Sequence, residues 1–160
     1  MTDRSVSHGT FVIERRYPAP PAKVFGAWAN GAAKEIWMDD PDYKSDGGQY
    51  ELDFRVGGHE RFSGLAPDGK PYRYDALYYD IVPDHRIVYS YEMYADDARI
   101  SVSVATIEFA KSGDGTALTW TEQGAYLDGI DGPQASSLRK EGTTEMLDGL
   151  ARYLAPQTTP

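Results

Sequence analysis

The chain of 160 residues contains no cysteine, which excludes disulfide bonds, a thiolate nucleophile and cysteine-ligated metal sites. It also lacks an apolar run near the roughly 20 residues that a membrane-spanning helix needs, and its first residues, MTDRSVSHGT, lack the apolar core of a signal peptide. We therefore expect a cytoplasmic protein without a membrane span. Basic residues are few, with 16 Lys and Arg against 25 Asp and Glu and a formal net charge of −9. This balance argues against nucleic acid or an anionic membrane as the main partner.

Hydrophobic residues make up 41% of the chain and charged residues 26%, as in an ordinary folded domain with a sizeable core. The aromatic content is unusual, because 12 tyrosines stand against 5 phenylalanines. A buried tyrosine contributes a large ring but keeps a hydroxyl group that needs a hydrogen-bond partner. Many inward tyrosines would therefore suit an amphiphilic pocket better than a dry core.

The segment Pro133–Leu154 predicts one long C-terminal helix. One stripe of its surface, with spacings of three, four and seven residues, is formed by Leu147, Leu150, Ala151 and Leu154. A neighbouring stripe is formed by Gly142, Met146, Gly149 and Tyr153, with Leu138 at its edge. Each glycine weakens an exposed helix by roughly 1 kcal/mol relative to alanine. We therefore expect that a strand backbone packs closely against these glycines, or that they leave space for a bound molecule.

The rest of the chain predicts strands and two short helices. A first strand is expected at Thr10–Tyr17, a short helix from Pro21 to Trp28 and a second one at Ala32–Trp37. Runs of alternating apolar residues, separated by turn signals, then predict six more strands. These are Gln49–Val56, His59–Leu65, Tyr72–Val82, Arg86–Tyr94, Ile100–Lys111 and Thr116–Tyr126.

Two local features of these strands lead to specific predictions. Gly57-Gly58 predicts a tight hairpin turn, because both glycines can take a positive φ angle. In the strand Ile100–Lys111 the apolar positions change phase, from Ile100, Val102 and Val104 to Ile107 and Phe109. The change predicts a β-bulge near Ala105-Thr106.

Short turns between consecutive strands favour an antiparallel meander, whose apolar face must be covered. The C-terminal helix is the one segment long enough to cover it. The sequence thus predicts an α+β domain with a curved antiparallel sheet of about seven strands around that helix. This domain is expected at residues 10–155, between a flexible N-terminal tail at 1–9 and a C-terminal tail at 156–160. We also expect that an edge strand, such as Ile100–Phe109, could pair in a homodimer.

Five segments, in this order and spacing, resemble a known family. They are YPAPPAKVFGAW, DFRVGGHERFSG, DIVPDHRIVYSYEM, GTALTWTEQGAYLDG and EGTTEMLDGLARYL. From about Phe11 to Leu154 the chain resembles the SRPBCC superfamily (START-like, Bet v 1-like, helix-grip), and within it the AHSA1-like group related to the C-terminal domain of the activator of Hsp90 ATPase. The resemblance implies a helix-grip fold that holds a small hydrophobic or amphiphilic molecule between sheet and helix. It implies no cofactor and brings no catalytic motif.

Glu122 is the candidate for chemistry. It continues the phase of Leu118 and Trp120, so its side chain should point toward the helix. An inward carboxylate could act as a general acid or base, or hold a polar group of a ligand. The alternative is a glutamate at a strand end that reaches solvent or pairs with Arg61 or Arg73.

Aromatic side chains are the remaining candidates for a pocket wall. We expect Tyr89 and Tyr91 to point inward, whereas Tyr74 and Tyr78 compete with Leu77, Tyr79 and Ile81 for the inner face of their strand. Tryptophans and phenylalanines could either line a pocket or serve as plain core. The predicted ligand-binding set is Trp37, Phe54, Phe62, Tyr74, Tyr78, Tyr89, Tyr91, Trp120, Glu122, Leu138, Gly142 and Met146.

No metal site is expected. The three histidines, His8, His59 and His85, are far apart in sequence and lack a ligand spacing. The acidic groups Asp39-Asp40 with Asp42, and Asp128 with Asp131, lack the spacing of a calcium loop and fit turns and caps better. The leading hypothesis is thus a binding protein for a small amphiphilic molecule. The alternatives are a cyclase or hydrolase that uses Glu122 with nearby tyrosines, and a chaperone-linked interaction module.

Overall fold

The computed structural model describes residues 4–38 and 49–155 of the chain. Within these residues the predicted order of a strand, two short helices, six strands and a long helix is confirmed. The elements are β1 (Val6–Tyr17), α1 (Pro21–Ala29), α2 (Gly31–Trp37), β2 (Tyr50–Leu52), β3 (His59–Leu65), β4 (Pro71–Val82), β5 (Arg86–Ala95), β6 (Ala98–Ser112), β7 (Gly115–Leu127) and α3 (Ala135–Leu154). The acidic group Asp39-Asp40 with Asp42, expected to fit a turn, and the tail residues 1–3 and 156–160 lie outside the described part.

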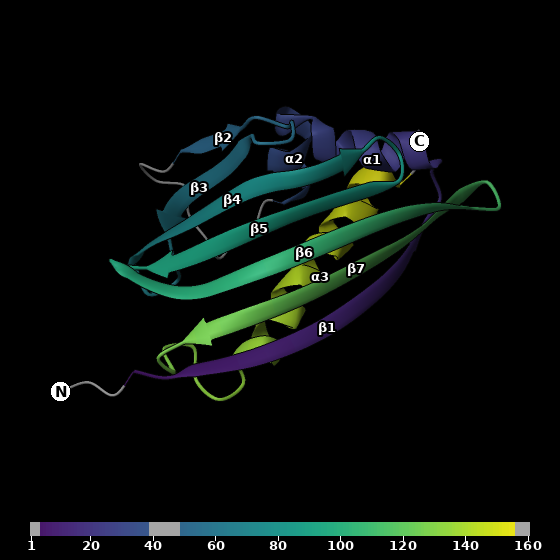
Figure 1. Ribbon diagram of the computed structural model, residues 1–160. Coiled ribbons are helices and arrows are strands. Elements are labelled where there is room, and N and C mark those ends of the chain that lie inside the picture. The colour runs from purple at the N-terminus through teal and green to yellow at the C-terminus, as the bar shows by residue number, and fades with distance from the viewer. Residues whose placement is uncertain (1–3, 39–48, 156–160) are drawn as a thin grey trace.

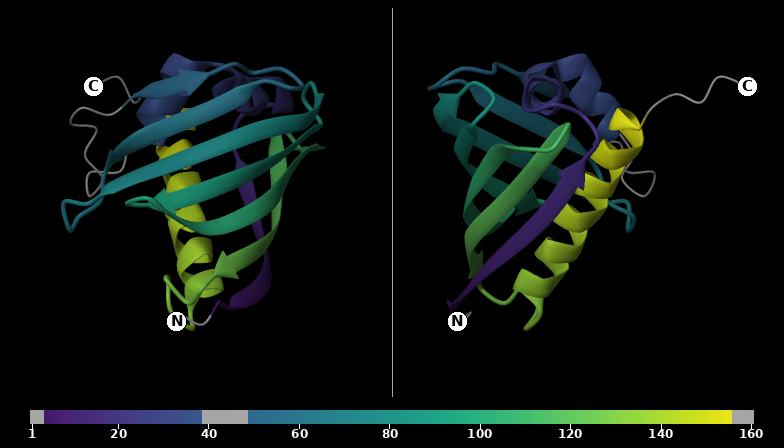
Figure 2. Two further views of the ribbon diagram at one scale, coloured as in Figure 1. Left: turned by 60° about the vertical axis from the view of Figure 1, so that its left-hand side comes forward. Right: turned by 90° about the vertical axis from the view of Figure 1, so that its right-hand side faces the viewer.

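The strands form one antiparallel sheet in the order β1-β7-β6-β5-β4-β3-β2. Figure 1 shows the sheet in front of α3, with α1 and α2 across one end. Figure 2 shows that the sheet curves around α3, which runs alongside β1. This is the predicted helix-grip architecture. Of the sheet's strands, α3 lies closest to β1 and β7, because the curvature carries the other strands away from it.

The N-terminal strand begins earlier than expected. Val6–Gly9 were predicted to belong to a flexible tail, but they pair with Gly124–Leu127 of β7. The sequence did not predict this extension, because Ser7, His8 and Gly9 show no alternation of apolar and polar residues. Hydrogen bonds between the backbones hold the segment instead.

The second predicted strand is also different, since β2 ends at Leu52 rather than Val56. Residues 53–58 form a loop instead of a two-residue hairpin. Gly57 has φ +84°, as expected, but Gly58 has no positive φ. Gly58 is required for another reason: a Cβ atom there would overlap the carbonyl oxygen of Asp53.

The predicted bulge at Ala105-Thr106 is wrong, because β6 pairs there without interruption with both β5 and β7. Register shifts occur instead at Tyr79 in β4, and in the pairing of Met93 and Tyr94 with β6, where Ile100 is skipped. The change of apolar phase in β6 has a different cause. Val102 and Val104 lie on the outer face of the sheet, and the inner positions are occupied by small residues, Ser101, Ser103 and Ala105.

The homodimer contact proposed for Ile100–Phe109 is also wrong in its location. β6 lies between β5 and β7 and has no free edge. The outermost strands among the described residues are β1 and β2.

The helix α3 buries Leu147, Leu150 and Leu154 against the sheet, as their spacing predicted. The glycine-containing stripe beside them is not uniform. Gly149 packs against the backbone of α2, where an added Cβ would overlap the carbonyl oxygen of Trp37, whereas Gly142 is exposed and has nothing within 4 Å of an added Cβ. Close packing, against a helix rather than a strand, therefore explains only one of the two glycines.

Candidate functional site

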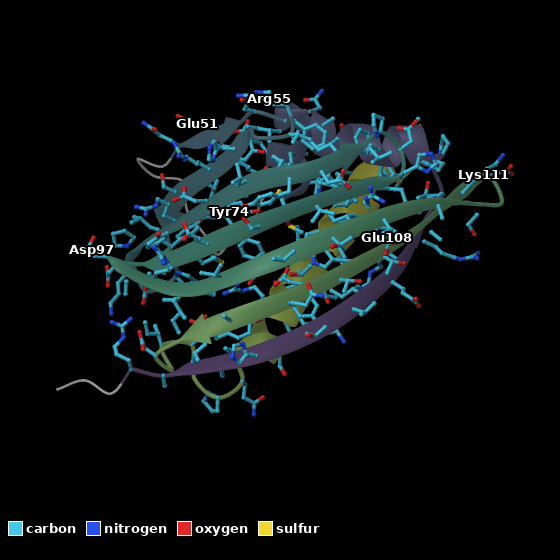
Figure 3. The ribbon with its side chains drawn as sticks, in the orientation of Figure 1. Glu51, Arg55, Tyr74, Asp97, Glu108 and Lys111 are labelled. Atoms are coloured by element: carbon cyan, nitrogen blue, oxygen red, sulfur yellow. The ribbon has the colours of Figure 1, made fainter. Side chains whose placement is uncertain are left out.

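The concave face of the sheet carries a row of tyrosines. The ring of Tyr91 lies 5.1 Å from that of Tyr74 and 5.9 Å from that of Tyr89, whose ring lies 5.7 Å from that of Tyr78. Tyr78, Tyr89 and Tyr91 are buried, and Tyr74 is half-buried. Figure 3 shows Tyr74 within the outline of the sheet rather than at its rim. The predicted inward direction of Tyr89 and Tyr91 is confirmed.

The β-bulge at Tyr79 determines which side chains of β4 point to the interior. Tyr78 points inward and Tyr79 is 59% exposed. Beyond the bulge at Tyr79 the phase reverses, so that Ile81 packs against the core as well. Tyr78 therefore faces the interior before the bulge, and Ile81 faces it after the bulge.

Glu122 lies beside this row, at Tyr91, and is fully buried. Its Oε2 accepts a hydrogen bond of 2.7 Å from the Tyr91 hydroxyl, and its Oε1 accepts one of 3.2 Å from the Trp120 indole nitrogen. The alternative partners Arg61 and Arg73 lie elsewhere, beside Asp75. The inward orientation inferred from the strand phase is thus confirmed.

The environment of Glu122 shifts its acidity. Burial raises the pKa of the Glu122 carboxyl, while the hydrogen bond from Tyr91, the charge of Arg139 and the hydrogen bond from Trp120 act in the opposite direction. Burial also raises the pKa of Tyr91 well above its ordinary value. The tyrosine hydroxyl therefore stays protonated at neutral pH and acts as a donor.

Arg139 of α3 completes this cluster and was not predicted from the sequence. Its Nη1 donates to the Tyr91 hydroxyl and to Ser101 Oγ, both at 3.1 Å, and its Nη2 lies 3.5 Å from Asp131 Oδ2. A signal was present, because Arg139 precedes Leu147 by eight residues and so shares the inner face of α3. Its charge suggested an exposed position, but this arginine is mostly buried.

Two hydroxyl groups in the same region form no hydrogen bond of good geometry among the described residues, although the Ser136 side chain lies beside the second of them. They are Ser103 Oγ on β6 and Tyr126 Oη on β7, and both residues are buried. A Cβ atom added to Gly124 would lie 3.0 Å from the first oxygen and 2.9 Å from the second. Glycine at 124 therefore allows both hydroxyls to pack closely against its backbone.

A second buried charged cluster lies toward α2 and was also not predicted. Lys34 Nζ lies 2.6 Å from Glu60 Oε2, which accepts a hydrogen bond of 2.7 Å from the Tyr50 hydroxyl. Lys34 also donates to the Tyr78 hydroxyl at 3.3 Å. Each polar group of this cluster has a partner within it. It therefore needs no external molecule.

The remaining predicted site residues lie in different surroundings. Trp37 is buried beside Trp28, with its indole nitrogen donating to the carbonyl oxygen of Ala27. Phe54, Phe62 and Met146 are half-buried. Leu138 is 54% exposed and Gly142 is exposed. These last two lie on the solvent side of α3, away from the tyrosine row.

Other features of the described residues lie away from this interior. One surface hollow of about 340 Å³ lies beside Tyr17 and Thr116, and one of about 540 Å³ lies on the exposed side of α3, beside Lys140 and Thr144. The three histidines are exposed. Asp128 accepts hydrogen bonds from the backbone nitrogen of Ser5 and from the Arg4 side chain, the turn role expected for it.

No group of three or more histidine or acidic side chains within the described ranges is arranged to hold a metal ion. In the same ranges, no helix is both long enough and apolar enough to cross a membrane. Room for a guest molecule between α3 and the sheet stays a prediction.

Comparison with known proteins places this fold in a family. A family model described as "Activator of Hsp90 ATPase homolog 1-like protein" matches residues 18–155. Among solved structures, an uncharacterized protein from Rhizobium leguminosarum is 42% identical, with a TM-score of 0.88 over 96% of this chain and 98% of that chain. Mll3558 from Rhizobium loti is 46% identical, with a TM-score of 0.84 over 94% of this chain and 99% of that chain.

A more distant structure, protein CV1439 from Chromobacterium violaceum, is 26% identical, with a TM-score of 0.75 over 92% of this chain and 98% of that chain. No curated protein matches the chain. The family match spans most of the sequence and agrees with the resemblance seen in its five segments. The chain therefore belongs to the family of Activator of Hsp90 ATPase homolog 1-like proteins.

Proposed function

We propose that the protein binds a small hydrophobic or amphiphilic molecule between the concave face of the sheet and α3. One observation carries the proposal. The charged and hydrogen-bonded cluster of Glu122, Tyr91 and Arg139 lies beside a row of aromatic rings on the concave face of the sheet. An interior that combines such a polar cluster with aromatic rings matches a ligand with a polar group and an apolar body.

The position of α3 supports the proposal. It lies closest to β1 and β7, whereas Tyr74 and Met93 are on β4 and β5, further round the curved sheet. Both side chains pack against the core yet stay half-buried. Apolar surface on the concave face thus remains for a guest to cover, and its burial contributes about 25 cal/mol per Å².

Native mass spectrometry of the freshly purified full chain tests the proposal. We expect a mass above that of the polypeptide, which disappears under denaturing conditions. We also expect added 1-decanol to raise the melting temperature, since a ligand at 100 times its Kd stabilises the folded state by about 2.7 kcal/mol. A guest-free native mass, together with no thermal shift up to the solubility limit of 1-decanol, would overturn the proposal.

Two neighbouring residues of β6 provide a matched control. Ser103 points into the interior and Val104 lies on the outer face. Ser103→Leu should fill the interior and reduce binding of 1-decanol, whereas Val104→Leu should leave it unchanged. Circular dichroism checks that both variants are folded. Equal binding by the two variants contradicts an interior site.

A second candidate, an enzyme, is favoured by the raised pKa of the buried Glu122 and its short hydrogen bond with Tyr91. A carboxyl with a raised pKa can act as a general acid near neutral pH. If the retained guest is a substrate, Glu122→Ala should abolish its conversion and spare its binding. Unchanged conversion in that variant excludes Glu122 as the catalytic group.

A further inference from the structure

Resting on the binding function proposed above, we infer that the ligand presents an uncharged oxygen, as in a ketone, an ester or an alcohol, to the hydroxyls of Tyr74 and Tyr89. Its apolar body then covers the half-buried side chains beside Tyr74. These two hydroxyls differ from their neighbours, because neither forms a hydrogen bond with any of the described residues.

The other two tyrosines of the row have partners. Tyr91 donates to Glu122 at 2.7 Å, and the Tyr78 hydroxyl accepts from Lys34 at 3.3 Å. Tyr89 lies between these two along β5 and its pairing with β4, and it is only 5% exposed. A buried hydroxyl without a partner is uncommon and reduces stability, so it calls for an explanation.

The oxygens of Tyr74 and Tyr89 can be reached by another molecule. They differ in this from the hydroxyls of Ser103 and Tyr126, whose oxygens are closed off by the surrounding atoms. A water-sized atom can still touch the oxygens of Tyr74 and Tyr89, although both rings pack within the aromatic row. An oxygen of a ligand can therefore take the place of the missing partner.

The two hydroxyls face the same part of the interior. Their rings lie on either side of Tyr91, 5.1 Å from it for Tyr74 and 5.9 Å for Tyr89. Apart from burial, the group that acts most strongly on the pKa of Tyr74 is the Tyr89 hydroxyl, ahead of Tyr91. Because such an effect weakens with distance, one polar group of a ligand can serve both hydroxyls.

Both hydroxyls offer a proton. Burial raises the pKa of each of the two tyrosines well above its ordinary value, so both stay protonated at neutral pH. The missing partner is thus a hydrogen-bond acceptor, and an oxygen with two lone pairs can accept from both.

The charges of the interior favour an uncharged acceptor. Lys34 pairs with Glu60 at 2.6 Å, and Arg139 lies 3.5 Å from Asp131. The remaining carboxylate, Glu122, accepts two hydrogen bonds. A cationic or anionic ligand group would find no unpaired countercharge here, and a buried unpaired charge is costly.

The place of the apolar body follows from the strand register. Phe62, Tyr74 and Met93 lie opposite one another on β3, β4 and β5. All three are half-buried, because α3 lies closest to β1 and β7 and leaves this row uncovered. The row begins at one of the two donor hydroxyls. A ligand bound there by its oxygen can therefore bury its apolar part against the row.

Four matched probes test the inference: 2-acetylnaphthalene, 2-ethylnaphthalene, 2-naphthoate and 2-naphthylmethylammonium. They share one aromatic body and carry a ketone, no polar group, an anion and a cation, respectively. Since two hydrogen bonds are involved, we expect the ketone to bind about 10- to 30-fold more tightly than the hydrocarbon, and both ions to bind more weakly than the ketone. Dissociation constants are measured by NMR titration of the full chain at pH 7.

Two variants that each remove one oxygen locate the effect. Tyr74→Phe and Tyr89→Phe should each weaken ketone binding about 5-fold and leave binding of 2-ethylnaphthalene unchanged. Both should melt no lower than the parent when empty, because the hydroxyl that each loses has no partner in the protein. Tyr79→Phe removes a hydroxyl from the outer face of β4, where Tyr79 is 59% exposed. This matched control should change neither binding nor melting.

The outcomes separate the inference from the proposed function. If 2-ethylnaphthalene binds as tightly as the ketone, or if either variant binds the ketone like the parent, the inference is wrong and the binding function stands. Tightest binding of one of the two ions would also overturn it, in favour of a charged ligand. Binding of none of the four probes contradicts the inference, and the 1-decanol titration then decides separately on the proposed function.

Discussion

Two acidic side chains, Glu60 and Glu122, lie fully buried on the concave face, and each is stabilised in a different way. Glu60 forms an ion pair with Lys34, and Glu122 accepts hydrogen bonds from neutral donors. A buried carboxylate loses its hydration, so such partners must replace it. The two residues should therefore respond differently to substitution.

Replacement of Lys34 by methionine leaves Glu60 buried without its cation. We expect Lys34→Met to lower the free energy of unfolding by about 3–5 kcal/mol. The double variant Lys34→Met, Glu60→Gln removes both charges and should recover more than half of that loss. Urea denaturation at pH 7 measures both values. A loss of less than about 1 kcal/mol in the single variant would show that the pair contributes little.

Glu122 should give the fold a characteristic pH dependence. Burial raises its pKa in the folded state above the ordinary value of 4.5, so the folded state holds a proton that the unfolded state has lost. The stability of the parent relative to Glu122→Gln should therefore fall as the pH rises from about 4.5 through the folded-state pKa, and stay level above it.

Urea denaturation between pH 4 and pH 8 measures this difference. The matched control is Glu108→Gln, on the exposed face of β6. A difference between parent and Glu122→Gln that grows with pH would contradict the raised pKa.

At the scale of elements, the C-terminal half of α3 is held by close contacts with α2 and β1. Gly149 lies against the carbonyl group of Trp37, where α2 ends, and the Tyr17 hydroxyl of β1 donates to the carbonyl oxygen of Leu147 at 3.1 Å. The helix is thus fixed to α2 and to β1. The N-terminal half of α3 carries Arg139, which donates hydrogen bonds to Tyr91 on β5 and to Ser101 on β6.

The two glycines of α3 should respond in opposite directions to the same substitution. Gly149→Ala should lower the free energy of unfolding by about 1–3 kcal/mol, because its Cβ overlaps the Trp37 backbone. Gly142→Ala should raise it by about 0.5–1 kcal/mol, because the site is open and alanine favours a helix. Thermal and urea denaturation measure both changes. Equal effects of the two substitutions would contradict the close packing of α3 against α2 at Gly149.

The elements were largely predictable from the sequence, because apolar alternation and turn residues are local signals. The inner face of β6 was not. Its inward positions are Ser101, Ser103 and Ala105, so the valines that looked like core lie on the outer face. Alternation shows that a strand has two faces, and it identifies the inner face only when that face is apolar.

The candidate site was predictable only in part, for a related reason. Glu122 could be placed inside because Leu118 and Trp120 fix the phase of its strand. The pairing of Lys34 with Glu60 joins residues far apart in the chain, which no local pattern reveals. Arg139 shares the inner face of α3 with Leu147, but its charge outweighed its spacing in the prediction.

At the scale of the whole molecule, the curved sheet, α3 and the two short helices surround one interior (Figure 2). That interior carries a row of aromatic rings with one buried charged cluster at Tyr78 and another at Tyr91. The cluster at α2 is closed by its own partners, whereas Glu122, Tyr91 and Arg139 lie beside the middle of the aromatic row. We therefore expect the polar group of a bound guest to lie near Glu122.

An NMR titration of the ¹⁵N-labelled full chain with 1-decanol tests the central claim most directly. The chain has three tryptophans, and only Trp120 donates its indole N–H to Glu122. Saturable shifts of the Trp120 indole signal and of the amide signals of Ser103 and Tyr126, with Trp28 unchanged, are the predicted result. Shifts confined to the outer face at Val102 and Val104, or no shift at all, would contradict an interior that binds a guest.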